Sequence, residues 1–334
     1  MEKMDYKSAG VDIAAGEKAV ESIKSMVRST FTPNVMTDLG KFGGFFALDL
    51  ARYETPVLVS SIDGVGTKLK VAFMMEKHDT VGEDLVNHCV NDILVGGARP
   101  LFFLDYIGTG KLQPGDVSSL ISGMVRGCKN AGCALVGGEM AEMPGFYQLG
   151  EYDVAGSIVG IVEKSKVIDG SSIAAGDVLV GLPSTGLHTN GYSLARKVLF
   201  DMAGFSVHTP IDRLGCSVGE ALLAVHRCYL PVVDPLLDSF PIKGMSHVTG
   251  GGIIGNTKRI LPEGLSLQIN WGAWEVPSIF QLIQEKGNVP EEDMRSAFNL
   301  GIGFIFIVSP ENRDALITQL ESAGEKPVVV GQVI

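Results

Sequence analysis

The sequence predicts a two-domain α/β protein, and three observations support this prediction. The chain has 334 residues, which is long enough for two domains that each bury a substantial core. Hydrophobic residues make up 46% of it, and short apolar runs rich in β-branched residues alternate with segments of helical periodicity. A polar stretch at residues 163–177 separates two such blocks, so we expect domains at residues 1–165 and 166–334.

In the first block, short apolar runs bounded by glycine or aspartate predict strands, and apolar residues three or four positions apart predict helices. The alternation of the two patterns indicates helices layered on a sheet. The expected strands cover residues 56–61, 101–107, 134–136 and 154–162, and the expected helices cover 17–28, 81–95 and 117–130.

The second block also alternates between the two patterns, in a more varied order. It therefore predicts a second layered α/β domain. The expected strands cover residues 178–182, 265–269, 302–308 and 328–333, and the expected helices cover 192–202, 218–229 and 312–321.

The charge of the chain limits its partners. Lysine and arginine total 27 and aspartate and glutamate total 38, so the formal net charge is −11. Nucleic acids and anionic membrane surfaces need a basic patch, and we therefore expect neither as a partner. A small anionic ligand is compatible with this charge if backbone N–H groups, a few lysines or a cation receive it.

Cysteine usage and hydropathy predict a cytoplasmic protein. The five cysteines are odd in number and contain no CxxC pair, so we expect reduced thiols rather than disulfides or a zinc site. The longest apolar run, at residues 301–308, is far shorter than the roughly 20 residues that cross a bilayer. The first ten residues lack the apolar segment of a secretory signal.

Glycine is frequent, with 42 residues, and several glycines stand beside a carboxylate just after a predicted strand. The clearest case follows the first strand and contains Asp63, Gly64, Gly66, Thr67 and Lys68. Glycines let a backbone approach a phosphate closely, and a carboxylate can hold the Mg²⁺ that accompanies it. On local spacing alone, a tight turn that exposes a lysine explains this segment equally well.

Two further acidic residues border buried segments or glycines. Asp92 lies within the apolar pattern of the second predicted helix, where a carboxylate is costly unless it is paired or bound to a cation. We interpret Asp92 as a second Mg²⁺ ligand, with a helix-surface aspartate as the alternative. Glu139 follows Gly137 and Gly138 at a strand end, which is a weaker signal of the same kind. We expect His88, one turn before Asp92, to be a packed or hydrogen-bonded residue rather than a ligand.

Two loops in the second block have the composition of anion-binding turns. One has the sequence STGLHTNGYS at 184–193, between a predicted strand and a predicted helix. Such a loop can bind a phosphate at the helix N-terminus, with His188 as an acid, a base or a charge stabiliser. The other, SHVTGGG at 246–252, also precedes a helical pattern. Either loop alone can be explained as a helix cap. The chain has five glycine-rich loops, the fifth at Gly145 after an acidic segment, and this number favours ligand binding.

Together these segments resemble the phosphoribosylformylglycinamidine cyclo-ligase family, also called the aminoimidazole ribonucleotide synthetases. The similarity extends nearly from end to end, and several of the shared strings are individually rare. It includes YKSAGVDIAAG (6–16), DGVGTKL (63–69), CVNDI (89–93), PLFFLDY (100–106), LVGGE (135–139), AEMPG (141–145), YDVAG (152–156), HTNGYS (188–193), HVTGGG (247–252) and FNLGIG (298–303).

The resemblance implies a fold and a reaction. It implies a two-domain AIR-synthetase-like fold, in which an N-terminal mixed sheet forms a half-barrel completed across a homodimer and a C-terminal mixed sheet is flanked by helices. In the implied reaction, ATP phosphorylates the formyl amide oxygen of formylglycinamidine ribonucleotide, and the amidine nitrogen closes the imidazole ring as phosphate leaves. The products are 5-aminoimidazole ribonucleotide, ADP and phosphate, in de novo purine biosynthesis.

The resemblance also implies roles for individual residues. Catalytic roles fall to His188, Asp92 and Lys24, and Mg²⁺ is expected at Asp63, Asp92 and Glu139. Periodicity alone would make Lys24 a surface residue at the edge of an amphipathic helix. ATP is expected at Lys24, Asp63, Gly64, Gly66, Thr67, Lys68, Gly137, Gly138 and Glu139, and the substrate is expected at His188, Asn190, Ser193, Thr249, Gly250 and Gly251.

Four positions depart from the family pattern. Ile62 and Met140 replace threonines near the glycine loops, Arg99 replaces a glutamate, and Leu187 replaces a proline before His188. Two alternatives to the cyclo-ligase follow from the residues. One is another ATP-dependent phosphoryl-transfer enzyme of the same superfamily, such as a thiamine-monophosphate kinase. The other is a non-catalytic nucleotide-binding protein, which would be expected to lose the acidic residues that this chain retains.

Overall fold

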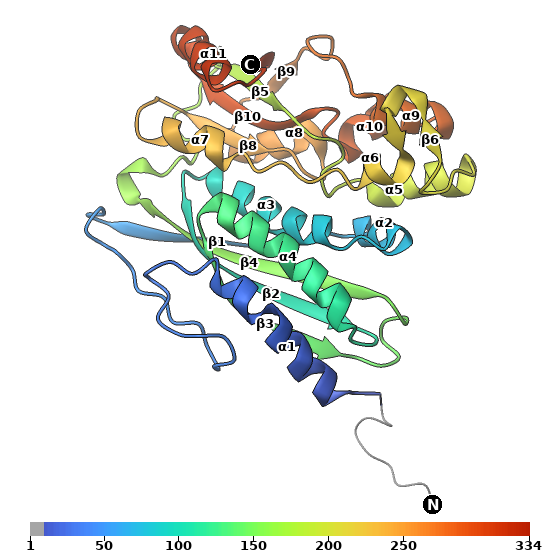
Figure 1. Cartoon of the computed structure of the whole chain (residues 1–334). Coiled ribbons are helices and arrows are strands. Elements are labelled where there is room, and N and C mark those ends of the chain that lie inside the picture. Colours follow the sequence, from blue (N-terminus) through green and yellow to red (C-terminus); the bar gives the residue numbers. More distant parts are fainter. Residues whose placement is uncertain (1–9) are drawn as a thin grey trace, which may run out of the picture. The chain divides into compact units, whose positions relative to one another are not determined.

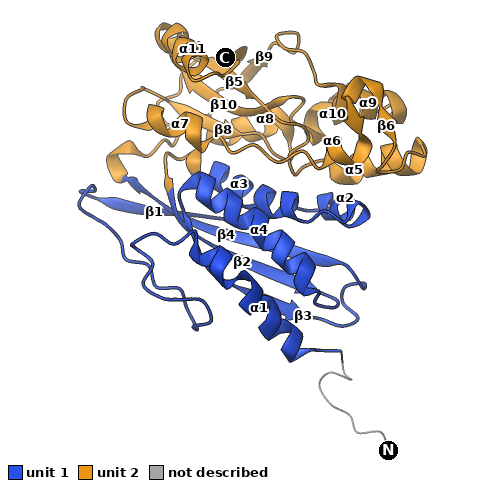
Figure 2. Ribbon diagram, viewed as in Figure 1, with its two compact units in different colours: residues 1–93, 100–163 blue, residues 94–99, 164–334 orange. Residues whose placement is uncertain are grey.

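The computed structural model describes residues 10–334, so residues 6–9 of the first shared string lie outside the described part of the chain. The chain divides into two compact units, coloured separately in Figure 2. Unit 1 comprises Met1–Ile93 and Pro100–Glu163, and unit 2 comprises Leu94–Arg99 and Lys164–Ile334. Each unit has its own sheet and its own helices (Figure 1), which confirms the predicted α/β class.

Unit 1 contains a four-stranded mixed sheet with the order β1-β4-β2-β3. Strands β1 (Pro56–Gly64) and β4 (Tyr152–Glu163) pair antiparallel. Strands β2 (Arg99–Thr109) and β3 (Ala134–Glu142) run parallel, which requires a long crossover between them. Periodicity predicts all four strands but makes each too short, because glycines and polar residues occupy their ends.

The helices of unit 1 cover one face of this sheet. They are α1 (Ile13–Arg28), α2 (Lys68–Met75), α3 (Asp79–Leu94) and α4 (Pro114–Ala131). Helices α1 and α4 contact β3 and each other, and α3 is packed against α4 (Figure 1). Burial alternates along β1, as it must where only one face of a strand is covered.

Two glycines allow α3 and α4 to cross at very short range. A Cβ atom added to Gly82 would lie 2.0 Å from the carbonyl oxygen of Leu120, and one added to Gly123 would lie 1.8 Å from that of Asp79. Both distances are far below van der Waals contact, so a side chain at either position would force the helices apart. The crossing therefore fixes the position of α3, the helix that carries His88 and Asp92.

The other face of the unit 1 sheet exposes apolar side chains. Leu58 and Ile62 of β1 are 56% and 70% exposed, and Tyr106 of β2 is 36% exposed. Large apolar side chains gathered on one open sheet face are typical of an interaction surface.

Unit 2 is built on a five-stranded sheet with the order β8-β10-β5-β11-β9. Strand β10 has every residue buried, which explains its continuous apolar sequence. All neighbouring strands pair antiparallel, whereas we expected a mixed sheet here. The strands are β5 (Val178–Pro183), β8 (Gly244–His247), β9 (Leu267–Ile269), β10 (Ile302–Val308) and β11 (Val328–Val333).

The other elements of unit 2 are short. A hairpin pairs β6 (Pro210–Ile211) with β7 (Cys216–Ser217), and the predicted helix at 192–202 consists of α5 followed by a π-helical segment, Lys197–Met202. The helices are α5 (Tyr192–Arg196), α6 (Val218–Leu222), α7 (Leu230–Leu237), α8 (Gly252–Thr257), α9 (Ser278–Gly287), α10 (Glu291–Ala297) and α11 (Arg313–Ser322).

One predicted helix is wrong in its extent. Residues 218–229 were expected to form a single helix, but α6 ends at Leu222 and α7 begins only at Leu230. The Tyr192 hydroxyl donates a hydrogen bond to the Leu222 carbonyl, and the Thr185 hydroxyl donates one to the Val225 carbonyl. Side chains from distant segments thus bond carbonyls that a continuous helix would bond internally.

We expect Gly123→Ala to destabilise unit 1 strongly, because the new Cβ would collide with the backbone of α3. Overpacking of this kind costs about 3 kcal/mol. Gly115 lies on the same helix with nothing within 4 Å of an added Cβ, so Gly115→Ala is the matched control and should be neutral or slightly stabilising. Calorimetric unfolding measures the melting temperature of both variants. Equal melting temperatures would contradict this account of the helix crossing.

Candidate functional site

Two carboxylates from different elements meet in unit 1. Asp63 lies near the end of β1, and Asp92 lies on α3, one turn after His88. His88 Nε2 is 3.6 Å from Asp63 Oδ2 and 4.0 Å from Asp92 Oδ2. The Ser61 hydroxyl donates a hydrogen bond of 3.2 Å to Asp92 Oδ2. The structure therefore brings together the two predicted Mg²⁺ ligands and places His88 beside both carboxylates.

The electrostatics of this pair favour a bound cation. Burial and the neighbouring Asp92 raise the pKa of Asp63 to about 7, and a hydrogen bond with Ser61 opposes the rise. Like charges at this range cannot both ionise without cost, so the pair keeps a proton unless a cation replaces it. The Asp63 and Asp92 side chains are 32% and 28% exposed to solvent, so an ion can reach them. Carboxylate oxygens are suitable ligands for a hard divalent ion.

The glycine segment after Asp63 leads from β1 into α2. Gly66 has a φ of +57°, in the left-handed region that favours glycine. Lys68 begins α2 with its side chain fully buried, and its Nζ lies 2.7 Å from Oδ2 of the equally buried Asp84 on α3. Burial lowers the pKa of Lys68, and Asp84 counteracts this. Lys68 thus has an internal partner, and contacts of ATP with Gly64, Gly66, Thr67 and Lys68 stay predictions.

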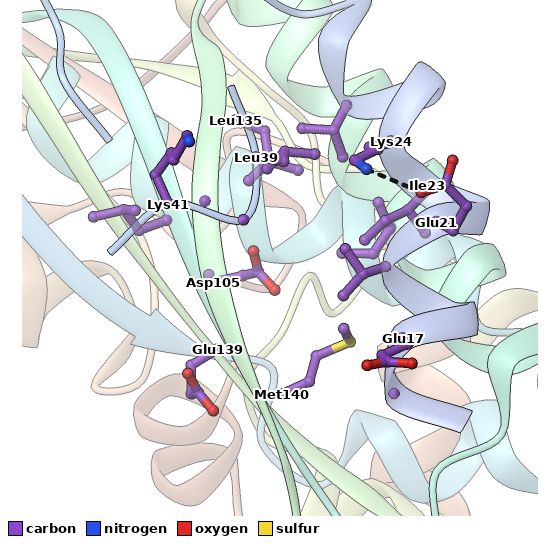
Figure 3. Close-up of a pocket in the computed structure, with 18 of the residues that line it drawn as sticks. Glu17, Glu21, Ile23, Lys24, Leu39, Lys41, Asp105, Leu135, Glu139 and Met140 are labelled. Atoms are coloured by element: carbon purple, nitrogen blue, oxygen red, sulfur yellow. Dashed lines mark hydrogen bonds and ion pairs between the residues drawn. The ribbon is translucent and has the colours of Figure 1, made fainter. Parts of the chain in front are cut away.

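A cavity of about 910 Å³ lies in unit 1 between α1, residues 38–44 and β3. Lys24 projects from α1, and its Nζ is 2.9 Å from Glu21 Oε2 (Figure 3). The cavity gathers four residues that the family resemblance assigns to ATP. These are Lys24, Gly137, Gly138 and Glu139.

Asp105 lies on β2 and lines the same cavity (Figure 3), although it was not among the predicted site residues. Burial raises the pKa of its carboxyl group to about 7. A Cβ atom added to Gly138 would lie 2.3 Å from Asp105 Oδ1, so the glycine makes room for this carboxylate. The signal in the sequence was an aspartate inside the apolar run FFLDYI, at a position where burial is costly without a partner.

The cavity lining is more acidic than basic. An anionic ligand there needs backbone N–H groups or a cation to offset the repulsion. Its charged residues are Lys24 and Lys41 on the basic side and Asp12, Glu17, Glu21, Asp38, Asp105, Glu139 and Glu142 on the acidic side.

The three expected Mg²⁺ ligands do not lie together: two lie at the carboxylate pair beside His88, and the third lies at the unit 1 cavity. Glu139 is on β3 and Asp63 is on β1, the outer strands of the sheet, with β4 and β2 between them. Neighbouring strands lie about 4.8 Å apart, so these two backbones are separated by about 14 Å. A single ion cannot contact both side chains within one chain. Asp63 and Asp92 form one acidic group, and Glu139 lies with Asp105 at the cavity.

In unit 2, the two predicted substrate loops lie side by side. A Cβ atom added to Gly250 would lie 3.1 Å from Asn190 Oδ1, so the loops are in close contact. Asn256 organises the second loop, because its amide nitrogen donates hydrogen bonds to the carbonyls of Thr249 and Gly250. Gly251 follows with a φ of +104°, which few side chains would tolerate.

His188 occupies a constrained position in the first of these loops. Its φ is +60°, a left-handed conformation that is uncommon outside glycine. Its Nε2 accepts a hydrogen bond from the Thr185 backbone at 3.2 Å, and its carbonyl oxygen lies 3.2 Å from the Tyr192 hydroxyl. Ser193 lies exposed in the first turn of α5. The roles of His188, Asn190 and Ser193 toward a substrate stay predictions.

The four departures from the family pattern occupy different environments. Arg99 forms ion pairs with Asp234 and, at 2.7 Å, with Asp238, all within unit 2. A glutamate at position 99 would be repelled by both carboxylates. Leu187 is buried, Ile62 is exposed on the open sheet face, and Met140 lines the unit 1 cavity.

Comparison with known proteins gives the relatives of this chain. Residues 49–162 match the N-terminal domain of AIR synthase related proteins, and residues 174–334 match the C-terminal domain. A phosphoribosylformylglycinamidine cyclo-ligase from Desulfitobacterium hafniense is 56% identical over 98% of this chain and 96% of the relative.

Solved structures share the fold at much lower identity. A thiamine-monophosphate kinase from Stenotrophomonas maltophilia has a TM-score of 0.69 and 14% identity, over 93% of each chain. The hydrogenase maturation protein HypE in complex with ATP has a TM-score of 0.66 and 17% identity, over 95% of this chain and 86% of that chain. At such identities the likeness shows the fold alone, and it confirms the expected AIR-synthetase-like architecture.

We expect Asp63→Asn to stabilise the protein at pH 8 in buffer without divalent cations. The pKa of Asp63 is about 7 in the folded protein against an ordinary value of 3.8, so the folded state binds more protons between these values. The free energy of unfolding therefore falls as the pH rises through that window. An asparagine at position 63 does not titrate, so the variant keeps this free energy. With allowance for partial exposure to solvent, the gain at pH 8 is about 1 kcal/mol.

The gain should vanish near pH 4, where the carboxyl group is protonated in the folded state. Urea unfolding at both pH values, with a chelator present, measures it. Asp201→Asn is the control, because Asp201 is exposed and pairs with a surface lysine one helical turn away. An equal gain at both pH values would mean that the carboxylate pair is not the cause.

Proposed function

This chain belongs to the phosphoribosylformylglycinamidine cyclo-ligase family, and from that membership we propose how its residues carry out ring closure. The enzyme converts formylglycinamidine ribonucleotide to 5-aminoimidazole ribonucleotide in purine biosynthesis, with ATP converted to ADP and phosphate. The observation that carries the assignment is 56% identity over 98% of the chain to a cyclo-ligase, against 14% to the structurally similar kinase.

The reaction has two bond-forming steps. The formyl amide oxygen attacks the terminal phosphorus of ATP, and the bond from that phosphorus to the bridging oxygen of ADP breaks. The amidine nitrogen then attacks the activated carbon, loses a proton, and phosphate leaves. Phosphoryl transfer needs positioning and charge neutralisation more than a protein nucleophile, which agrees with a site of carboxylates and glycine loops.

We assign Mg²⁺ to the carboxylates of Asp63 and Asp92. The raised pKa of Asp63 and the short separation of the two groups support this assignment, because a cation removes the repulsion that otherwise holds a proton there. When bound, Mg²⁺ would neutralise phosphate charge as it develops during transfer, with the phosphates of ATP extending from the unit 1 cavity to this carboxylate pair. His88 and Ser61 contact these carboxylates and would fix their orientation.

The unit 1 cavity is the place we propose for ATP. Its volume of about 910 Å³ falls in the range of small-molecule sites, and Lys24 supplies a cationic group beside the Gly137-Gly138 backbone. The relative HypE, solved with ATP, has the same fold. The acidic lining, with Asp105 and Glu139, suits a nucleotide that arrives with cations rather than bare.

The substrate is assigned to the two adjoining loops of unit 2. His188 and Asn190 from one loop, and Thr249, Gly250 and Gly251 from the other, present an imidazole, an amide, a hydroxyl and backbone N–H groups. Backbone N–H groups near a helix start can receive the ribose phosphate without basic side chains.

A homodimer would cover the open sheet face of unit 1. Leu58, Ile62 and Tyr106 lie exposed on that face, and a second copy of the same surface would bury them in a two-fold contact. The substitution of isoleucine at position 62 increases the apolar area available for such a contact.

Other partners are not expected, and the location proposed is the cytoplasm. The five cysteines are free thiols, as in a reducing compartment. No helix among residues 10–334 is both long and apolar enough to cross a bilayer. The net charge of −11 disfavours binding to nucleic acid.

We expect Asp92→Asn to lower the rate of ATP-dependent ring closure by about 10- to 100-fold and to raise the Mg²⁺ concentration that the reaction requires. The asparagine can still accept the hydrogen bond from Ser61, so the fold should persist. ADP release with formylglycinamidine ribonucleotide measures turnover, and Asp201→Asn is the control. Wild-type turnover in Asp92→Asn at limiting Mg²⁺ would remove Asp92 from the site.

We expect Ile62→Asp to shift the protein from dimer to monomer, because a charge would be buried in the contact between two sheets. Sedimentation over a range of concentrations measures the association. Met202→Asp is the matched control, since Met202 is 58% exposed but lies on a helical segment of unit 2. A wild-type association constant for Ile62→Asp would exclude this face as the dimer contact.

A further inference from the structure

Three histidines from separate segments of unit 2 converge in its interior. His188 follows β5, His226 lies between α6 and α7, and His247 ends β8. Their exposures are 1%, 0% and 6%, and one ring nitrogen from each lies within 4.8 Å of the other two. Burial of three titratable rings together is uncommon and needs a physical explanation.

The rings of His226 and His247 point toward each other and share a hydrogen bond. Their Nε2 atoms are 2.9 Å apart. Two imidazoles bound to one tetrahedral metal ion have nitrogens about 3.3 Å apart, so a small opening of this pair would admit an ion. The Nδ1 atom of His226 faces the Thr189 hydroxyl at 3.3 Å. That contact can hold the Nδ1 proton and leave Nε2 as the ligand atom, as outer contacts of metal-binding histidines do.

His188 supplies a third imidazole. Its ring stacks on that of His226, with centroids 4.1 Å apart and planes 16° from parallel. The His188 ring lies close to the backbone of β10, because a Cβ atom added to Gly303 would lie 2.6 Å from His188 Cε1. To bind a shared ion through Nε2, the ring would tilt and exchange its hydrogen bond from Thr185 for a metal bond.

We propose that His188, His226 and His247 form a binding site for a transition-metal ion of the Zn²⁺, Co²⁺ or Ni²⁺ type. Neutral imidazoles prefer these borderline ions, whereas Mg²⁺ prefers oxygen ligands. The group contains no carboxylate, so it differs in chemistry from the Asp63–Asp92 pair of unit 1. The site shares His188 with the proposed substrate loops, so the inference extends the proposed function, and ion binding is measured separately from turnover.

The test is a titration of the full chain, first stripped with a chelator, with Co²⁺ in the presence of excess Mg²⁺. Mg²⁺ keeps oxygen-ligand sites occupied. We expect one equivalent of Co²⁺ to bind and to give the visible absorption of a four- or five-coordinate nitrogen site, and Zn²⁺ to displace it. His226→Ala should weaken Co²⁺ binding at least about tenfold. His208→Ala is the matched control, because His208 is an exposed histidine of the same unit, and it should bind as wild type does.

Two further measurements keep the test decisive. If His226→Ala fails to fold, His226→Gln preserves most of the volume and a polar contact to Thr189. X-ray absorption of the wild-type Co²⁺ protein should show scattering from imidazole rings and no sulfur ligand. Absence of a bound equivalent, a thiolate charge-transfer band, or unchanged affinity in a folded His226 variant would overturn the proposal.

Discussion

The carboxylates of Asp63 and Asp92 share a small volume on a chain whose net charge is already −11. Neither can easily move away, because the pairing of β1 with β4 fixes Asp63 and the close crossing of α3 and α4 fixes the helix that carries Asp92. The repulsion between them is therefore part of the fold of unit 1. A proton relieves it in the free protein, and in our proposal a divalent cation relieves it when ATP binds.

Glycine has two separate uses in this chain, and only one could be predicted from sequence. Glycines beside carboxylates, such as Gly66 and Gly138, mark turns and cavity walls and were expected there. Gly82, Gly123 and Gly156 instead serve packing, since an added Cβ on each would meet a neighbouring helix backbone or the ring of Phe103. A glycine inside a helix gives no indication in the sequence of which backbone will approach it.

Periodicity predicted the strands of the unit 1 sheet and the α/β class, because these depend on local patterns of apolar residues. It did not predict the break between α6 and α7, since the hydroxyls of Thr185 and Tyr192 that bond this region come from distant positions. It also could not predict that Lys68 is buried against Asp84, or that His226 joins His188 and His247. These pairings join residues that are far apart in the sequence, so the local spacing of residues gives no information about them.

The most direct test of the central claim is proton release on cation binding. Calorimetric titration with Mn²⁺ at pH 6, in buffers of different ionisation enthalpy, counts the protons that leave the protein. Because the pKa of Asp63 is about 7, we predict close to one proton released per ion at pH 6, far fewer at pH 8, and none from this site in Asp63→Asn. Equal proton release from wild type and Asp63→Asn at pH 6 would contradict a cation at the carboxylate pair.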